Sequence, residues 1–135
     1  MPDDVVMQKL ASIDRCLRAI RDYVAGDVGR LREPIVLDAV VLNLQRACEQ
    51  AIDAACREVS RRELGVPTDS ADAFTLLERE RLVSPEVAER MRRMVGFRNI
   101  AVHEYRKLDP LIVRTVVEHR LGDFLAFCRE LSAAS

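Results

Sequence analysis

The chain has 135 residues, of which 49% are hydrophobic and 32% charged, and its formal net charge is −1. That length fits one domain around one core, and the small numbers of Gly and Pro, five of each, exclude collagen-like and low-complexity classes. The balanced charge does not favour a globally basic nucleic-acid-binding protein, but it permits a local basic face.

The first predicted helix runs from about Val5 to Ala25, and a polar loop over 26–34 follows it. Its apolar residues recur at alternating spacings of three and four, which is typical of a helix with one narrow buried stripe. The stripe consists of Val6, Leu10, Ile13, Leu17, Ile20 and Val24.

The second predicted helix begins near Pro34, which suits a first turn, and runs to about Leu64. Its apolar residues form two adjacent stripes, so we expect it to contact several neighbours and to be the central helix. Gly65 and Pro67 mark its end.

A turn-rich loop over 66–72 precedes a short third helix with core contacts at Phe74, Leu77 and Leu82. The run Ser84-Pro85-Glu86 then predicts the start of a fourth helix, because serine caps well and proline fits the first turn. A second start signal, Asp109-Pro110, predicts a fifth helix that continues unbroken to the C-terminus. Its stripe would be Val113, Val117, Leu121, Phe124, Cys128 and Leu131.

Short loops between these helices predict antiparallel neighbours. We therefore expect an all-α, up-and-down bundle of four to five helices in a single domain over residues 1–135. The sequence has no strand pattern and no Gly-rich phosphate loop.

Four cysteines are spread along the chain and form no CxxC pair: Cys16, Cys48, Cys56 and Cys128. Neither histidine stands at a metal-ligand spacing from them, so we expect free core-facing thiols, no metal and a reduced cytoplasmic setting. The acidic N-terminus lacks the apolar segment of a signal peptide, and no apolar run approaches the roughly 20 residues that span a bilayer.

Positive charge gathers in the fourth helix and just beyond it. From Arg90 to Lys107 there are six basic residues and one acid, Glu104, so the local net charge is +5. Arginines bind phosphate in a bidentate manner, which suggests an RNA-backbone surface, although a solvated helix face has the same pattern. The candidate RNA-binding residues are Arg90, Arg92, Arg93, Arg106 and Lys107.

Arg98 stands where the apolar stripe of Val87, Met91 and Met94 calls for another apolar residue. Burying an unpaired guanidinium is costly, so Arg98 needs an ion-pair partner or an open cleft. Gly96 is also unusual inside a helix, and it would allow another backbone or a ligand to approach closely.

Asn99 and His103 are four positions apart and share one face of the helix, whereas Arg98 and His103 lie about 140° apart around it. One helix therefore does not aim Arg98 and His103 at the same small target unless it kinks or two copies meet. His103 can exchange protons near neutral pH, Arg98 can stabilise charge on a phosphate, and Asn99 can orient the imidazole or a phosphate oxygen. These roles suit metal-free RNA cleavage.

The segment from Arg98 to Tyr105 resembles the R-x4-H-x-Y signature of HepT-type HEPN-domain toxins. Three longer segments resemble the same family in the expected order: 41–49, 72–77 and 94–103. The resemblance implies a HEPN homodimer with facing motifs and a metal-independent endoribonuclease toxin that cuts tRNA or mRNA, not DNA. Arg98 and His103 would be catalytic, with Asn99 in support.

The resemblance also implies the partner and the regulation. In this type VII toxin–antitoxin arrangement, the antitoxin MntA is a nucleotidyltransferase that moves AMP from ATP to the motif tyrosine, here Tyr105. The toxin itself would need no cofactor. Two alternatives remain: a non-catalytic HEPN module that binds RNA or nucleotide or scaffolds a nucleotidyltransferase, and a helical dimerisation protein with a merely solvated basic face.

Overall fold

A computed structural model of the protein describes residues 3–134, and the elements over this range are all helical. They are α1 (Asp4–Val24), η1 (Val28–Arg32), α2 (Pro34–Arg61), α3 (Ser70–Arg79), α4 (Pro85–His103), η2 (Tyr105–Lys107), α5 (Pro110–His119) and α6 (Leu121–Ala134).

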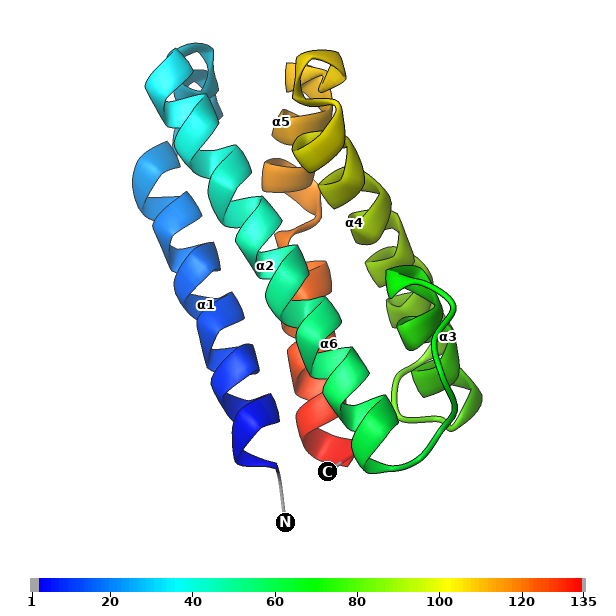
Figure 1. Cartoon of the computed structure of the whole chain (residues 1–135). Coiled ribbons are helices and arrows are strands. Elements are labelled where there is room, and N and C mark those ends of the chain that lie inside the picture. The colour runs from blue at the N-terminus through cyan, green and yellow to red at the C-terminus, as the bar shows by residue number, and fades with distance from the viewer. Residues whose placement is uncertain (1–2, 135) are drawn as a thin grey trace.

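Four long helical segments alternate in direction: α1, α2, α4 and the pair α5–α6 (Figure 1). The short α3 packs against α2 and α4. Both ends of the chain lie at one end of the bundle, while the start of α2 and the end of α4 lie at the other (Figure 1). The expected all-α, up-and-down bundle is thus confirmed.

The α2 helix is central, as its two apolar stripes predict. It packs against α1, α3 and α4 and buries residues over a wide arc. Three phenylalanines complete the core, namely Phe74, Phe124 and Phe127, and the rings of Phe74 and Phe127 meet edge to face with centroids 5.4 Å apart. Such aromatic pairs add about 0.5–1.5 kcal/mol beyond the area that they bury.

Local signals fix the starts of three helices. Ser84 Oγ accepts a hydrogen bond from the Val87 amide at 3.3 Å, and Asp109 Oδ1 accepts one from the Leu111 amide at 2.9 Å. Both N-caps are those that the sequence predicts. At the start of α1, Asp3 Oδ1 accepts from the amides of Val5 and Val6.

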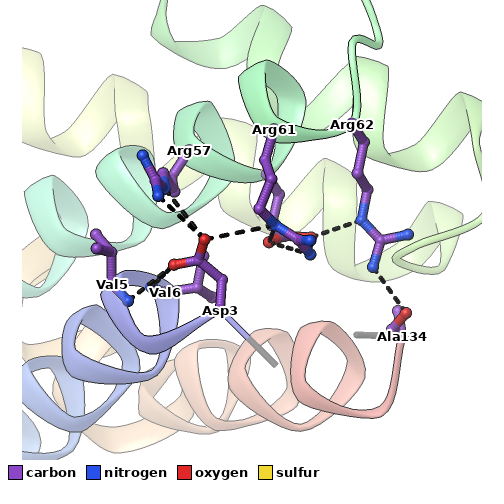
Figure 2. Close-up of polar contacts among 8 residues, drawn as sticks. Asp3, Val5, Val6, Arg57, Arg61, Arg62 and Ala134 are labelled. Carbon is purple, nitrogen blue, oxygen red and sulfur yellow. Dashed lines mark hydrogen bonds and ion pairs between the residues drawn. The ribbon is translucent and has the colours of Figure 1, made fainter. Parts of the chain in front are cut away.

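An acid–arginine cluster lies at the end of the bundle that carries Asp3 and Ala134 (Figure 2). Glu58 is buried, and its carboxylate accepts from Arg61 at 3.0 Å and from Arg62 at 2.7 Å. Arg62 also donates to the carbonyl of Ala134 at 2.9 Å, while Asp3 pairs with Arg57 and Arg61 (Figure 2). The cluster joins the end of α2 to the first and last described residues.

Two predicted boundaries are wrong. The α2 helix ends at Arg61, three residues earlier than expected, because Glu63 and Gly65 adopt positive φ. The predicted fifth helix is two helices that break at Arg120. The buried residues Val116 and Leu121 are five positions apart, which one straight helix does not keep on one face, and Gly122 weakens the helix at the break.

The core positions of this last segment differ accordingly. Val113, Leu121, Phe124 and Leu131 are buried as predicted, but Val117 and Cys128 are only half-buried. Val116 and Phe127 take the buried positions instead.

Candidate functional site

Most residues of the predicted basic face form ion pairs, two with acids of α3 and α6 and two with acids close by in the same segment. Four of its six members form ion pairs: Arg90 with Asp123 at 3.6 Å, Arg92 with Glu78 at 3.0 Å, Arg93 with Glu89 at 2.9 Å and Lys107 with Glu104 at 3.4 Å. Within the described range, the remaining two, Arg98 and Arg106, have no carboxylate at ion-pair distance. Positive charge without a carboxylate partner is therefore confined to fewer residues, Arg98 and Arg106, than the sequence indicates.

Arg98 is half-buried and points from α4 toward α2 and α3. One guanidinium nitrogen, Nη2, donates to Ser70 Oγ at 3.2 Å, at the start of α3. Its Nε is buried and has no hydrogen-bond partner among the described residues. Because no carboxylate neutralises this guanidinium in the described range, its positive charge remains available to an anion.

Cys48 of α2 lies near Arg98, and its burial shows that water is excluded from the side of Arg98 that faces α2. Burial raises the pKa of the Cys48 thiol to about 12, although the positive charge of Arg98 opposes the shift. The thiol donates to the Met94 carbonyl at 3.5 Å. The Cys48 thiol is therefore unreactive, and it lies beside the buried part of Arg98.

Asn99 and His103 lie on the outer face of α4, and both are exposed. Gly96 shares this face, and a Cβ added there would meet nothing within 4 Å. Ile100, 39% exposed, lies beside them. The outer face of α4 therefore combines polar motif residues with an apolar residue and a flat glycine, while Arg98 projects inward.

Tyr105 opens the η2 turn that follows α4, and its side chain is 45% exposed. Its hydroxyl donates a short hydrogen bond to Asp38 Oδ1 in the second turn of α2. This bond raises the pKa of the Tyr105 phenol, with smaller contributions from burial and from the charge of Asp38. The motif tyrosine is therefore tied to α2 rather than free in solvent.

Two surface hollows flank the Tyr105 ring. A hollow of about 230 Å³ is lined by Tyr105 together with Asp38, Val41, Leu42 and Gln45. A smaller one of about 50 Å³ is apolar and is lined by Leu37, Val41, Leu108, Pro110 and Val113 beside the same ring.

The arrangement brings the predicted site residues to one end of α4 but does not converge them. Arg98 faces inward, Asn99 and His103 face outward, and Tyr105 turns toward α2. Sequence reasoning missed Ser70 and Asp38, which contact the motif from positions 28 and 67 residues away. In the sequence Asp38 is simply an acid in an early turn of a predicted helix, and that feature is too common to single it out.

Among residues 3–134, no group of three or more His, Cys, Asp and Glu is placed to hold a metal ion. No helix in the described part of the chain is long and apolar enough to cross a membrane.

Comparison with known proteins decides the family. The profile of ribonuclease HepT-like proteins matches residues 13–131 of this chain. The chain belongs to the HepT-like ribonuclease family. The resemblance that the sequence carries is thereby confirmed.

Relatives in this family include named nucleases. The mRNA nuclease HepT of Shewanella oneidensis is 41% identical over 132 residues, which cover 97% of this chain and 98% of the relative. The tRNA nuclease HepT of Aphanizomenon flos-aquae is 28% identical over 90 residues, covering 67% of this chain and 61% of the relative.

A solved structure shows the same HepT-like fold in a complex. It contains a tri-AMPylated HEPN toxin from Shewanella oneidensis with MNT antitoxin. That toxin superposes on this chain with a TM-score of 0.92 at 39% identity, and the match covers 98% of this chain and 99% of the other.

Proposed function

We propose that this chain is the toxin of a type VII, HepT/MntA-like toxin–antitoxin pair, and that it is a metal-independent endoribonuclease of the cytoplasm, acting as one domain. The observation that carries the proposal is Arg98, a half-buried guanidinium without a carboxylate partner in the described range and with its Nε unsatisfied. Such a group is suited to bind the phosphate of an RNA backbone.

In the proposed reaction the ribose 2′-hydroxyl attacks the adjacent phosphorus. A bond forms between O2′ and phosphorus, and the bond from phosphorus to O5′ breaks, which leaves a cyclic phosphate and a 5′-hydroxyl. His103 takes or gives the proton, Arg98 stabilises the negative charge that builds on the phosphate, and Asn99 orients the imidazole or a phosphate oxygen. Arg106, which has no ion pair in the described range, would guide the rest of the strand. The other predicted RNA-binding residues would do so by exchanging their carboxylate partners for phosphate: Arg90, Arg92, Arg93 and Lys107.

The proposed site is shared by two copies of the chain. Arg98 points inward on α4 while His103 points outward, so a single copy presents them in different directions. The open Gly96 and the exposed Ile100 suit close packing of one α4 against another. A symmetric dimer of this kind would place two Arg98–His103 pairs around one cleft.

Tyr105 is the proposed point of control. A nucleotidyltransferase antitoxin similar to MntA would transfer AMP from ATP to its exposed hydroxyl. The added phosphate would place negative charge two residues from His103, where it would occupy the RNA phosphate site and repel the RNA backbone.

The relatives support two candidate substrate classes. The mRNA nuclease from Shewanella oneidensis matches nearly the whole chain and supports mRNA, whereas the tRNA nuclease from Aphanizomenon flos-aquae supports tRNA as the second candidate. Sequencing of RNA ends after brief expression of the chain separates the two, because new ends should lie mainly in mRNA if the first is right.

Substitution tests the site. Purified His103→Ala and Arg98→Ala should each lose at least about 100-fold in RNA cleavage, the range expected for a general acid–base or charge-stabilising group. His119→Ala is the matched control, because His119 is the chain's other histidine and is exposed on a different helix. Unimpaired cleavage by His103→Ala would overturn the proposal.

A further inference from the structure

The hydrogen bond from Tyr105 to Asp38 joins the proposed modification site to a second element. Tyr105 lies in the η2 turn after α4, and Asp38 lies in the second turn of α2. The two segments meet at the end of the bundle opposite the chain termini (Figure 1). Both side chains are exposed, so a partner enzyme can reach them together.

Hydrogen bonds hold the backbone and the hydroxyl of Tyr105. The Leu108 amide donates to the Tyr105 carbonyl at 3.0 Å, and the Lys107 amide donates to the Glu104 carbonyl at 2.8 Å. The ring lines an apolar hollow together with Leu37 and Val41, which flank Asp38 on α2. The turn and the bond to Asp38 thus place the Tyr105 hydroxyl against α2.

Two acids neighbour Tyr105, one in the chain and one in space, and they differ in their partners. Glu104 is adjacent in the chain, but its carboxylate pairs with Lys107 at 3.4 Å. Asp38 has no ion pair in the described part of the chain, and its Oδ1 accepts from the Tyr105 hydroxyl. A carboxylate that is not neutralised by a cation remains able to accept a proton.

We propose, resting on the proposed function, that Asp38 is the catalytic base for AMP transfer to Tyr105. The Tyr105 oxygen attacks the α-phosphorus of ATP, a new oxygen–phosphorus bond forms, and the bond to the bridging oxygen of pyrophosphate breaks. The phenolic proton passes to Asp38 Oδ1, to which it is already hydrogen-bonded, and from there to solvent. Pyrophosphate leaves.

This assignment is chemically coherent. An ordinary phenol has a pKa of about 10, so very little phenolate exists at neutral pH, and the bond to Asp38 raises the pKa further. Without a base, the rate of AMP transfer would be limited by the small fraction of Tyr105 that is ionised. With Asp38 in place, the proton moves as the oxygen–phosphorus bond forms, since the phenol oxygen then becomes strongly acidic.

The test is a time course of intact mass with the cognate nucleotidyltransferase, magnesium and saturating ATP. Asp38→Asn keeps a hydrogen-bond acceptor but removes the base, so the turnover rate for the first AMP should fall on the order of 100-fold with little change in KM. Asp38→Glu restores a carboxylate and should recover part of the rate. Glu104→Gln is the matched control, because it removes a nearby negative charge but not the bond to Tyr105.

The pH profile separates a base from a structural tether. Between pH 6.5 and 9 the rate of the unsubstituted chain should be nearly flat, whereas that of Asp38→Asn should rise about tenfold per pH unit, because only solvent-ionised phenol then reacts. Normal rate and a flat profile in Asp38→Asn would overturn the assignment, as would an equal loss in Glu104→Gln.

Tyr105→Phe keeps this inference separate from the proposed function. If Tyr105→Phe abolishes modification while Asp38→Asn is modified normally, Asp38 is not the base and the proposed function stands. If Tyr105→Phe is still modified, the proposed modification site itself is wrong.

Discussion

At the scale of single residues, Arg98 carries a cost in stability. Its side chain enters the bundle without a carboxylate partner in the described range, and its Nε is buried there without a hydrogen-bond partner. A buried donor left unsatisfied costs about 1–3 kcal/mol. In the proposed site this cost is offset in function, because the guanidinium would bind the phosphate of the substrate.

Replacing Arg98 with Met should therefore keep or increase the free energy of unfolding, by about 1 kcal/mol, while it abolishes RNA cleavage. Methionine fills similar space and leaves no unsatisfied donor. Urea unfolding monitored by circular dichroism measures the stability, with Arg18→Met on the exposed face of α1 as the control. A loss of more than about 2 kcal/mol would mean that Arg98 is structural.

The anomaly of Arg98 was visible in the sequence, because the residue interrupts a regular apolar stripe. The contacts of Tyr105 were not. Asp38 lies 67 residues away in the chain, and only the folded arrangement of α2 against the end of α4 brings the two side chains together. The pairing of Arg90 with the buried Asp123 was hidden for the same reason.

At the scale of elements, helix starts were predictable and helix ends less so. The Ser84 and Asp109 caps are encoded within three residues, so the sequence alone locates them. The break at Arg120 depends on which side chains the core accepts, with Val116 and Phe127 buried in place of Val117 and Cys128. That choice is made by neighbouring helices, not by local propensity.

Gly96 offers a test of the α4 face. Alanine there meets no atom of the same chain, so Gly96→Ala should increase the free energy of unfolding of the protomer by about 1 kcal/mol through helix propensity. A bulkier Gly96→Leu should weaken the proposed dimer by keeping two α4 helices apart. Light scattering coupled to size-exclusion chromatography measures the dimer, and Gly122→Leu is the control at another open glycine.

An unchanged dimer in Gly96→Leu would place the contact between copies elsewhere on the molecule. The shared site would then need a different explanation for the opposed directions of Arg98 and His103.

The N-cap of α1 gives a prediction with a defined pH dependence. Burial alone would raise the pKa of Asp3, but the Val6 amide, the Arg57 guanidinium and the Val5 amide outweigh it and hold the pKa below its usual value. A lowered folded pKa means that Asp3 stabilises the fold fully above about pH 4 and loses this effect as the pH falls through the folded value.

Asp3→Ala should accordingly lower the melting temperature at pH 7, and the difference from the unsubstituted chain should shrink as the pH falls below 4. Thermal unfolding at a series of pH values measures it, with the exposed Asp22→Ala as the control. A constant difference across this range would show that the charge of Asp3 does not matter.

At the scale of the whole molecule, the two ends of the bundle hold different features. The end that carries Asp3 and Ala134 is tied together by the Glu58 cluster, in which one buried carboxylate accepts from two arginines. The other end carries η2, Tyr105 and Asp38, with two hollows beside the Tyr105 ring. Between the two ends α4 carries Arg98 and His103, so the proposed cleavage and its proposed control share one helix and the turn that follows it.

The fold class and family membership followed from periodicity, caps and motif segments, because these are local properties of the chain. For the motif side chains, helix geometry predicted only that Arg98 and His103 point in different directions. In the proposed site a second copy of the chain joins them, and no pattern within one sequence specifies that contact.

The most direct test of the central claim is the chemistry of the ends that the purified, unmodified chain leaves on RNA in excess EDTA. Attack by the ribose hydroxyl at a site built from Arg98 and His103 predicts 2′,3′-cyclic phosphate and 5′-hydroxyl ends, with no loss of rate when divalent metal is removed. Products with 5′-phosphate ends, or cleavage that appears only with added magnesium, would contradict the account.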